Sequence, residues 1–183
     1  MVTVGTYRVR MRRTGLLGLI CALVLACLTG CSAPIEGAVG VRLDPDGRLV
    51  GVFDWCRGEG AVVITLYRGM DNGGVKGRVI QLEREQDRRA RETEDVVLLD
   101  PADGWRTKLA AATLDDEQIY DLRAWNEDGG AVDDFPFRVS ELRDRVGPNT
   151  ILTKNWEGDT DGGYIATYRT REDFARYAET VCD

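Results

Sequence analysis

The 183-residue sequence contains no His. A chain without His cannot form a Ser-His-Asp triad, a Cys-His catalytic pair or an HExxH zinc site, because each of these requires an imidazole. Ser is almost as scarce, with only Ser32 and Ser140, and neither stands in a G-x-S-x-G or S-x-x-K motif. These absences exclude His-dependent catalysis. The remaining composition, 43% hydrophobic and 30% charged, is typical of a soluble globular domain.

The first part of the chain has the organisation of an export signal. A basic segment over 8–13 carries four Arg, and no acidic residue occurs in 1–30. The apolar run 16–28 that follows is shorter than the ~20 residues of a bilayer-spanning helix, and it has the length of the hydrophobic region of a signal peptide. We therefore expect residues 1–30 to form a cleaved signal helix rather than a retained membrane helix.

The residues Leu28, Thr29, Gly30 and Cys31 resemble the lipobox of bacterial lipoprotein precursors, which consists of Leu, a small or branched residue, Gly or Ala, and Cys. In that family the Cys thiol receives a diacylglyceryl group, and a peptidase then cleaves the chain before it. The resemblance implies that Cys31 is the lipidated first residue of the mature chain. Two or more acyl chains on one residue give stable membrane anchoring. The alternative is a secretory signal that ends at a Cys by chance.

The resemblance also implies a division of the chain into a signal peptide, 1–30, a lipidated tether, 31–37, and a domain, 38–183. The domain would be held at the cell membrane by its lipid anchor and would face outside the cytoplasm. Loss of the signal removes four Arg and no acid, which leaves 20 basic and 31 acidic residues and a net charge of −11. An acidic domain is a poor partner for nucleic acid and for anionic lipid headgroups. Only three of the 24 basic residues are Lys, which indicates GC-rich coding, as in high-GC Gram-positive bacteria.

The five Cys residues divide into three groups. Cys21 and Cys27 leave with the signal, Cys31 is lipidated, and Cys56 and Cys182 remain. Two thiols outside the cytoplasm favour one disulfide, which would close a loop of more than a hundred residues. The alternative is two unrelated buried thiols. Two Cys without His supply only half of a zinc site, so we expect no metal and no cofactor.

The part of the chain after the tether alternates short strand-like segments with turns, which is typical of an all-β domain. Asp44-Pro45-Asp46-Gly47 joins the clearest pair of strands as a tight hairpin turn. The charge-dense run 83–95 is predicted to be an exposed loop or short helical turn, and a docking strip is the functional alternative. The strand segments that the pattern predicts are 38–43, 49–56, 61–67, 77–82, 96–99, 105–111, 116–126, 135–139, 151–156 and 164–168.

The segment 116–130 carries a weak resemblance to immunoglobulin-like sandwiches. Asp116 followed by Tyr120 is similar to the tyrosine corner before strand F of that fold, and Gly129-Gly130 would form the turn to the next strand. Leu122 stands where antibody domains place their second core Cys. We therefore expect a mainly β fold, an immunoglobulin-like antiparallel β-sandwich without the inter-sheet disulfide of antibodies.

A short C-terminal α-helix is expected to complete the domain. Thr170 with Asp173 approximates a capping box. The apolar residues that follow recur at helical spacing and would pack on the sandwich, where Cys182 can reach Cys56. These residues are Phe174, Tyr177, Ala178 and Val181.

Two further patterns suggest ligand sites. Exposed aromatic rings stack on sugars, and Trp156, Tyr164 and Trp125 are the candidates for such contacts, with burial in the core as the alternative. The acidic stretch 157–162 is similar to the start of an EF-hand loop but lacks the closing Glu, so a hairpin turn explains it better than a calcium site.

The expected function is that of a membrane-anchored, non-catalytic binding or interaction module that contacts a protein or a polysaccharide of the cell envelope. A carbohydrate- or solute-binding lipoprotein is one alternative. A hydrolase of an envelope polymer that uses paired carboxylates is another, because such pairs cleave glycosides without His. The 31 acidic residues single out no particular pair.

Overall fold

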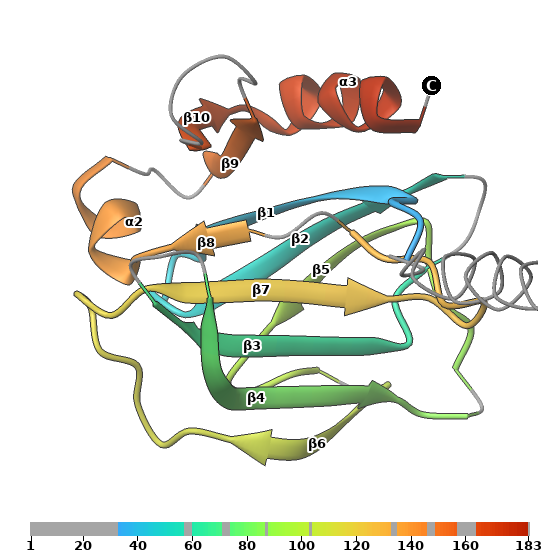
Figure 1. Cartoon of the computed structure of the whole chain (residues 1–183), viewed down its shortest axis with the longest axis horizontal. Coiled ribbons are helices and arrows are strands. Elements are labelled where there is room, and N and C mark those ends of the chain that lie inside the picture. Colours follow the sequence, from blue (N-terminus) through green and yellow to red (C-terminus); the bar gives the residue numbers. More distant parts are fainter. Residues whose placement is uncertain are drawn as a thin grey trace, which may run out of the picture. The chain divides into compact units, whose positions relative to one another are not determined.

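The domain is a sandwich of two antiparallel β-sheets with two short helices (Figure 1). The computed structural model describes residues 33–56, 60–70, 74–86, 88–102, 104–132, 135–145, 149–156 and 164–182. The signal segment and the proposed lipidation residue Cys31 lie outside the described residues, as does the acidic stretch 157–162. No helix within the described ranges is long and apolar enough to span a membrane.

Each sheet has five strands. The first has the order β10-β9-β1-β2-β5, and the second has the order β6-β4-β3-β7-β8. The strands of the first sheet are β1 (Gly37–Leu43), β2 (Leu49–Trp55), β5 (Thr93–Val97), β9 (Ile151–Trp156) and β10 (Tyr164–Arg169). Those of the second are β3 (Val63–Gly69), β4 (Val75–Arg84), β6 (Trp105–Ala110), β7 (Tyr120–Trp125) and β8 (Phe135–Phe137). The helices are α2 (Val139–Arg145) and α3 (Arg171–Cys182).

The strand order agrees with the expected immunoglobulin-like sandwich. In the first sheet, the order β1-β2-β5 corresponds to strands A, B and E of the immunoglobulin-like fold. In the second sheet, the order β4-β3-β7-β8 corresponds to its strands C′, C, F and G. The tyrosine corner is present, because the backbone N–H of Asp115 donates to the hydroxyl of Tyr120 at 2.8 Å. Leu122 is fully buried in the core. The strand β6 at the free edge of β4 and the hairpin β9–β10 beside β1 are additions to that plan.

The core fills the space between the sheets, and a smaller apolar cluster lies under α3. The alternating residues of β2 supply both, because Leu49 and Phe53 belong to the main core while Val50 and Val52 belong to the cluster under the helix. Burial of both faces explains why β2 is apolar from Leu49 to Phe53. The cluster under α3 consists of Ala38, Val50, Val52, Ile151, Phe174 and Ala178.

The C-terminal helix forms where the capping pattern predicts it. The hydroxyl of Thr170 accepts the backbone N–H of Asp173 at 3.1 Å and donates to the Asp173 carboxylate at 2.9 Å. Gly40 of β1 lets both β9 and the helix pack closely, because a Cβ there would lie 2.4 Å from Cγ2 of Ile151 on β9 and 3.3 Å from the ring of Phe174 on α3. The helix therefore covers β1 and β2 as expected.

Three features differ from the sequence prediction. The tether prediction ends at residue 37, but the backbone is already held at Pro34, whose carbonyl accepts the N–H of Ala131 at 2.9 Å. Strands β4 and β5 extend into the charge-dense run 83–95, so that only its middle is a loop. The helix α2 begins at Val139, the last residue of the predicted strand 135–139, and continues over residues for which no element was predicted. It buries Val139 and Leu142, three residues apart on one helical face.

Candidate functional site

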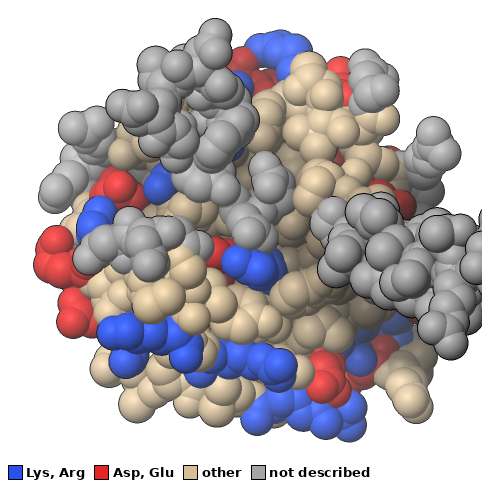
Figure 2. All heavy atoms as spheres, in the orientation of Figure 1, with Lys and Arg blue, Asp and Glu red and all other residues tan. Residues whose placement is uncertain are grey.

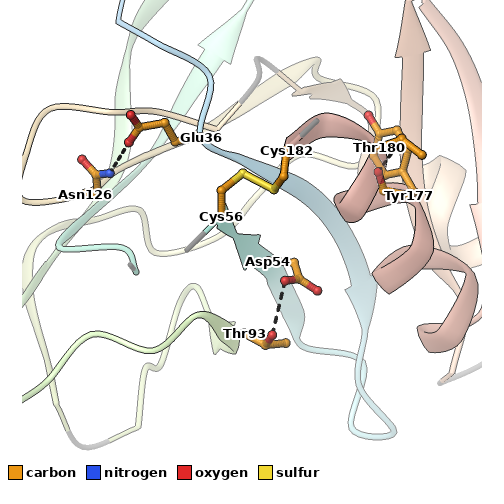
Figure 3. Close-up of a disulfide and its surroundings, with 8 residues drawn as sticks. All are labelled: Glu36, Asp54, Cys56, Thr93, Asn126, Tyr177, Thr180 and Cys182. Carbon is orange, nitrogen blue, oxygen red and sulfur yellow. Dashed lines mark hydrogen bonds between the residues drawn. A yellow bond between two sulfur atoms is a disulfide. The ribbon is translucent and has the colours of Figure 1, made fainter. Parts of the chain in front are cut away.

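Cys56 and Cys182 form a disulfide that links the end of β2 to the last residue of α3 (Figure 3). Their Cα atoms are 5.5 Å apart, and the bond joins positions 126 residues apart in the chain. The pairing is the one that the Cys count predicts. It fixes the C-terminal helix to the sandwich at a point far from the helix N-terminus.

The beginning of the described chain lies beside this disulfide. The backbone N–H of Cys56 donates to the carbonyl of Glu36 at 2.9 Å, and the amide of Asn126 donates to the Glu36 carboxylate at 2.7 Å (Figure 3). The first residues of the domain, the end of α3 and the turn after β7 therefore meet at one end of the sandwich. A tether that leaves the domain at Pro34 would leave it from this end.

The three aromatic residues predicted to contact a ligand come from two sheets. Trp156 and Tyr164 are opposite each other in the β9–β10 register, and their side chains lie outside what the structure describes. Trp125 is half-buried at the end of β7 in the second sheet, where it is paired with Val63. The β9–β10 hairpin, which the sequence predicts, therefore brings the backbones of Trp156 and Tyr164 together. Trp125 lies in the other sheet.

A groove of about 600 Å³ opens at the side of the sandwich where both sheets end, with β5 of one and β6 of the other in its wall. We call it the arginine groove because five of its lining residues are Arg. They are Arg84, Arg88, Arg89, Arg91 and Arg171. The two acidic residues in its lining are Glu94 and Asp95. The charge density of the run 83–95 distinguishes this region in the sequence, but the sequence pattern predicts no cavity there.

Arg84 and Glu94 are the most buried charged residues of the groove, with side chains 6% and 14% exposed. The guanidinium pairs with both carboxylate oxygens, and its Nε donates to the carbonyl of Ala61 at 2.7 Å. Trp105 covers the pair: its ring centroid lies 4.2 Å from the guanidinium carbon, and its indole N–H donates to Glu94 at 3.3 Å. The charge of Glu94 is therefore neutralised within the wall of the groove.

Asp95 is neutralised in the same way at the other end of the groove. Its two carboxylate oxygens accept from Arg42 at 2.9 Å and from Arg171 at 2.7 Å. One carboxylate thus lies between two guanidinium groups. Neither acidic residue in the lining has negative charge left to balance the three remaining Arg residues.

Those three residues, Arg88, Arg89 and Arg91, lie in the loop between β4 and β5 and are exposed. None of them forms an ion pair with another residue in the described ranges. The lining of the groove, five Arg against two carboxylates, therefore carries a net charge of +3 on a strongly acidic chain. Guanidinium groups in such a setting favour binding of an anion.

A second hollow of about 680 Å³ is lined by residues of the same loop and of the turn after β7. It shares Arg84, Arg88 and Arg89 with the arginine groove, but its lining also includes Glu85, Glu127 and Asp128. The charges of its lining nearly balance. Of the two hollows, the arginine groove is the one with a clear charge preference.

The outer face of the second sheet is also basic, and several of its cations are paired with carboxylates. Arg106 and Lys108 of β6 both contact Glu83 of β4, at 3.3 and 3.2 Å, and Arg123 pairs with Asp121 at 3.0 Å on β7. Figure 2 shows Lys and Arg side chains gathered over the part of the view where Figure 1 places β4 and β6. This face provides a basic surface for comparison with the groove.

Two ionisable side chains outside the groove have pKa values displaced by burial. Burial raises the pKa of Asp54, and Glu92 and Glu179 add to the rise, while a hydrogen bond from Thr93 and the charge of Arg171 oppose it (Figure 3). Burial also lowers the pKa of Lys154 on β9, against the attraction of Glu141.

No group of three or more His, Cys, Asp or Glu residues within the described ranges is placed to hold a metal ion. Comparison of the chain with protein-family models, with curated protein sequences and with solved structures finds no match.

Proposed function

We propose that this protein is a membrane-anchored lipoprotein whose domain acts outside the cytoplasm as a non-catalytic binding module of the cell envelope. The observation that carries the proposal is the run Leu28-Thr29-Gly30-Cys31, which follows a basic segment and a short apolar run. Acyl chains on Cys31 would supply the anchor.

The disulfide supports the proposed location. Disulfides form and persist in oxidising compartments outside the cytoplasm and are rare in the reducing cytosol. The two Cys residues among the described residues, Cys56 and Cys182, are paired, and they are the ones that would remain as thiols after signal cleavage and lipidation. The pairing therefore agrees with an exported domain whose other Cys residues have different fates.

The start of the fold supports the proposed arrangement at the membrane. Among the described residues, backbone hydrogen bonds to the sandwich begin at Pro34, three residues after Cys31. Three residues span about 10 Å when fully extended. The end of the sandwich that holds Glu36, Cys56 and Asn126 would then lie next to the bilayer surface, and the domain would have little freedom to move away from it.

The proposal is tested by expressing the full chain in a bacterium that processes lipoproteins and measuring the mass and location of the product. We expect a membrane-bound protein that lacks residues 1–30 and carries acyl chains on Cys31. Cys31→Ser should remove the acyl mass and release the protein from membranes. Cys27→Ser, a matched change within the signal, should leave both unchanged. A wild-type product that begins at Met1, or that has an unmodified Cys31, would contradict the proposal.

A further inference from the structure

We propose that the arginine groove binds the phosphate groups of an anionic ligand. The inference specifies the ligand chemistry of the binding function proposed above, and it rests on that function. The groove provides three Arg side chains, Arg88, Arg89 and Arg91, that have no acidic partner among the described residues, in a lining whose two carboxylates are already neutralised.

The charge of the groove favours a ligand with more than one negative charge. A single carboxylate carries one charge and would leave most of the +3 of the lining unbalanced. A phosphate monoester carries about −1.5 to −2 near neutral pH and offers three acceptor oxygens. The planar guanidinium fork also matches the geometry of phosphate oxygens and can donate two parallel hydrogen bonds to them.

The size of the groove suits such a ligand. Its volume of about 600 Å³ lies within the range of roughly 300–1,000 Å³ that small-molecule sites occupy in proteins. The lining also includes Trp105, Val96 and Val97 beside the charged residues. A ligand could therefore place phosphate groups among the Arg side chains and a less polar part against the wall.

The loop that carries the three Arg residues is held by backbone hydrogen bonds at both ends. At its start, the N–H of Glu85 donates to the carbonyl of Gly104 at 3.0 Å. At its end, the carbonyl of Glu92 accepts the N–H of Trp55 at 2.8 Å. The side chain of Arg88 passes close to Gly104, where a Cβ would lie 3.5 Å from its Cγ. Such a loop loses less conformational freedom on binding than an unattached one.

Phosphate could reach the groove from two sources, a lipid headgroup or a phosphorylated molecule in solution. The loop ends at Glu92, which is hydrogen bonded to Trp55, the neighbour of Cys56, and Cys56 is bonded to Glu36 at the start of the fold. The loop is therefore near the end of the domain from which the tether leaves. Both sources are within reach of a domain anchored at this end, so the experiment must separate them.

The test measures ligand binding by isothermal titration calorimetry on the full chain in a neutral detergent. The probes are inorganic tripolyphosphate, dihexanoyl phosphatidic acid below its micellar concentration, whose headgroup is a phosphate monoester, and dihexanoyl phosphatidylcholine as the headgroup control. The groove variant is Arg88→Gln/Arg89→Gln/Arg91→Gln. The charge-matched control is Lys76→Gln/Arg78→Gln/Arg106→Gln, which removes the same charge from exposed positions on β4 and β6.

We expect tripolyphosphate to bind the wild type, the groove variant to bind it at least tenfold more weakly, and the control variant to keep an affinity within about twofold. The same pattern with phosphatidic acid but not phosphatidylcholine would assign the phosphate to a lipid headgroup. Absence of binding by the wild type to both phosphate probes would overturn the inference. So would an equal loss of affinity in both variants, because net charge alone would then explain binding.

The thermal unfolding midpoint of each variant establishes that the groove variant is folded. Each of its three substitutions is at an exposed loop position, so we expect a midpoint close to that of the wild type. The mass measurement on Cys31 is independent of these titrations. A protein with unmodified Cys31 that still binds tripolyphosphate would contradict the lipid anchor and support the groove.

Discussion

Arg84 and Glu94 form an ion pair that spans the two sheets, because Arg84 ends β4 of one sheet and Glu94 belongs to β5 of the other. The pair is almost fully buried beneath Trp105. The charged run 83–95, which the sequence predicts to be a solvated loop, therefore contains a buried ion pair between the two sheets. This ion pair forms part of the wall of the arginine groove.

Glu94→Ala should destabilise the domain by roughly 3–5 kcal/mol, because removal of one partner of a buried pair leaves an uncompensated charge. The free energy of unfolding measured in urea tests this. Glu83→Ala is the matched control: Glu83 also pairs with cations, but these are exposed, and such pairs contribute about 0–1 kcal/mol. Equal losses in the two variants would show that the buried pair has no special role.

Gly40→Ala should destabilise the domain by about 1–3 kcal/mol, the usual cost of overpacking a well-filled core. The added Cβ would lie 2.4 Å from Cγ2 of Ile151 and 3.0 Å from the carbonyl oxygen of Leu152. Gly77→Ala in β4 is the control, because no heavy atom lies within 4 Å of a Cβ at that position. Denaturant unfolding of the two variants should separate them, and a tolerated Gly40→Ala would mean that β9 packs less closely against β1 than described.

Cys56→Ser/Cys182→Ser should lower the free energy of unfolding by about 2–5 kcal/mol, because the bond closes a long loop and restricts the unfolded chain. Unfolding curves of the wild type should move with added reductant, and those of the double variant should not. A reductant effect of the same size in the variant would argue that the disulfide is not its target.

Asp54→Asn should make the domain more stable than the wild type at neutral pH. The folded-state pKa of Asp54 is raised above its ordinary value of 3.8, so folding disfavours the carboxylate. The wild type gains stability as the pH falls through the raised pKa towards 3.8, because the folded state then binds the proton more readily than the unfolded chain. The advantage of the variant should shrink over that interval.

Unfolding free energies measured across this pH range test the prediction for Asp54. Glu127→Gln is the comparison, because it removes the same charge from an exposed turn. A stability difference between Asp54→Asn and the wild type that does not vary between neutral pH and 3.8 would contradict the argument.

Local patterns in the sequence predicted much of the fold. The hairpin turn at Asp44, the tyrosine corner at Tyr120, the capping box at Thr170 and the pairing of Cys56 with Cys182 each depend on a few residues whose chemistry permits few alternatives. Together they were sufficient to indicate a β-sandwich with a C-terminal helix packed on one of its sheets.

The arginine groove could not be predicted in this way, because it depends on contacts between distant segments. Arg171 at the start of α3 lines it together with Arg91, 80 positions earlier, and nothing local indicates that the two are close. Arg84 and Glu94 give no sign in the sequence that they are buried, since charged residues in a dense run are usually solvated. The helix α2 was missed because its apolar face consists of little more than Val139 and Leu142.

The disulfide between Cys56 and Cys182 changes the outcome of proteolytic cleavage within the loop that it closes. Any single cut between residues 57 and 181 would leave two fragments that are still covalently joined, because one retains Cys56 and the other Cys182. If Cys31 holds the chain at the membrane, both fragments of a cleaved domain would therefore stay attached to the cell surface.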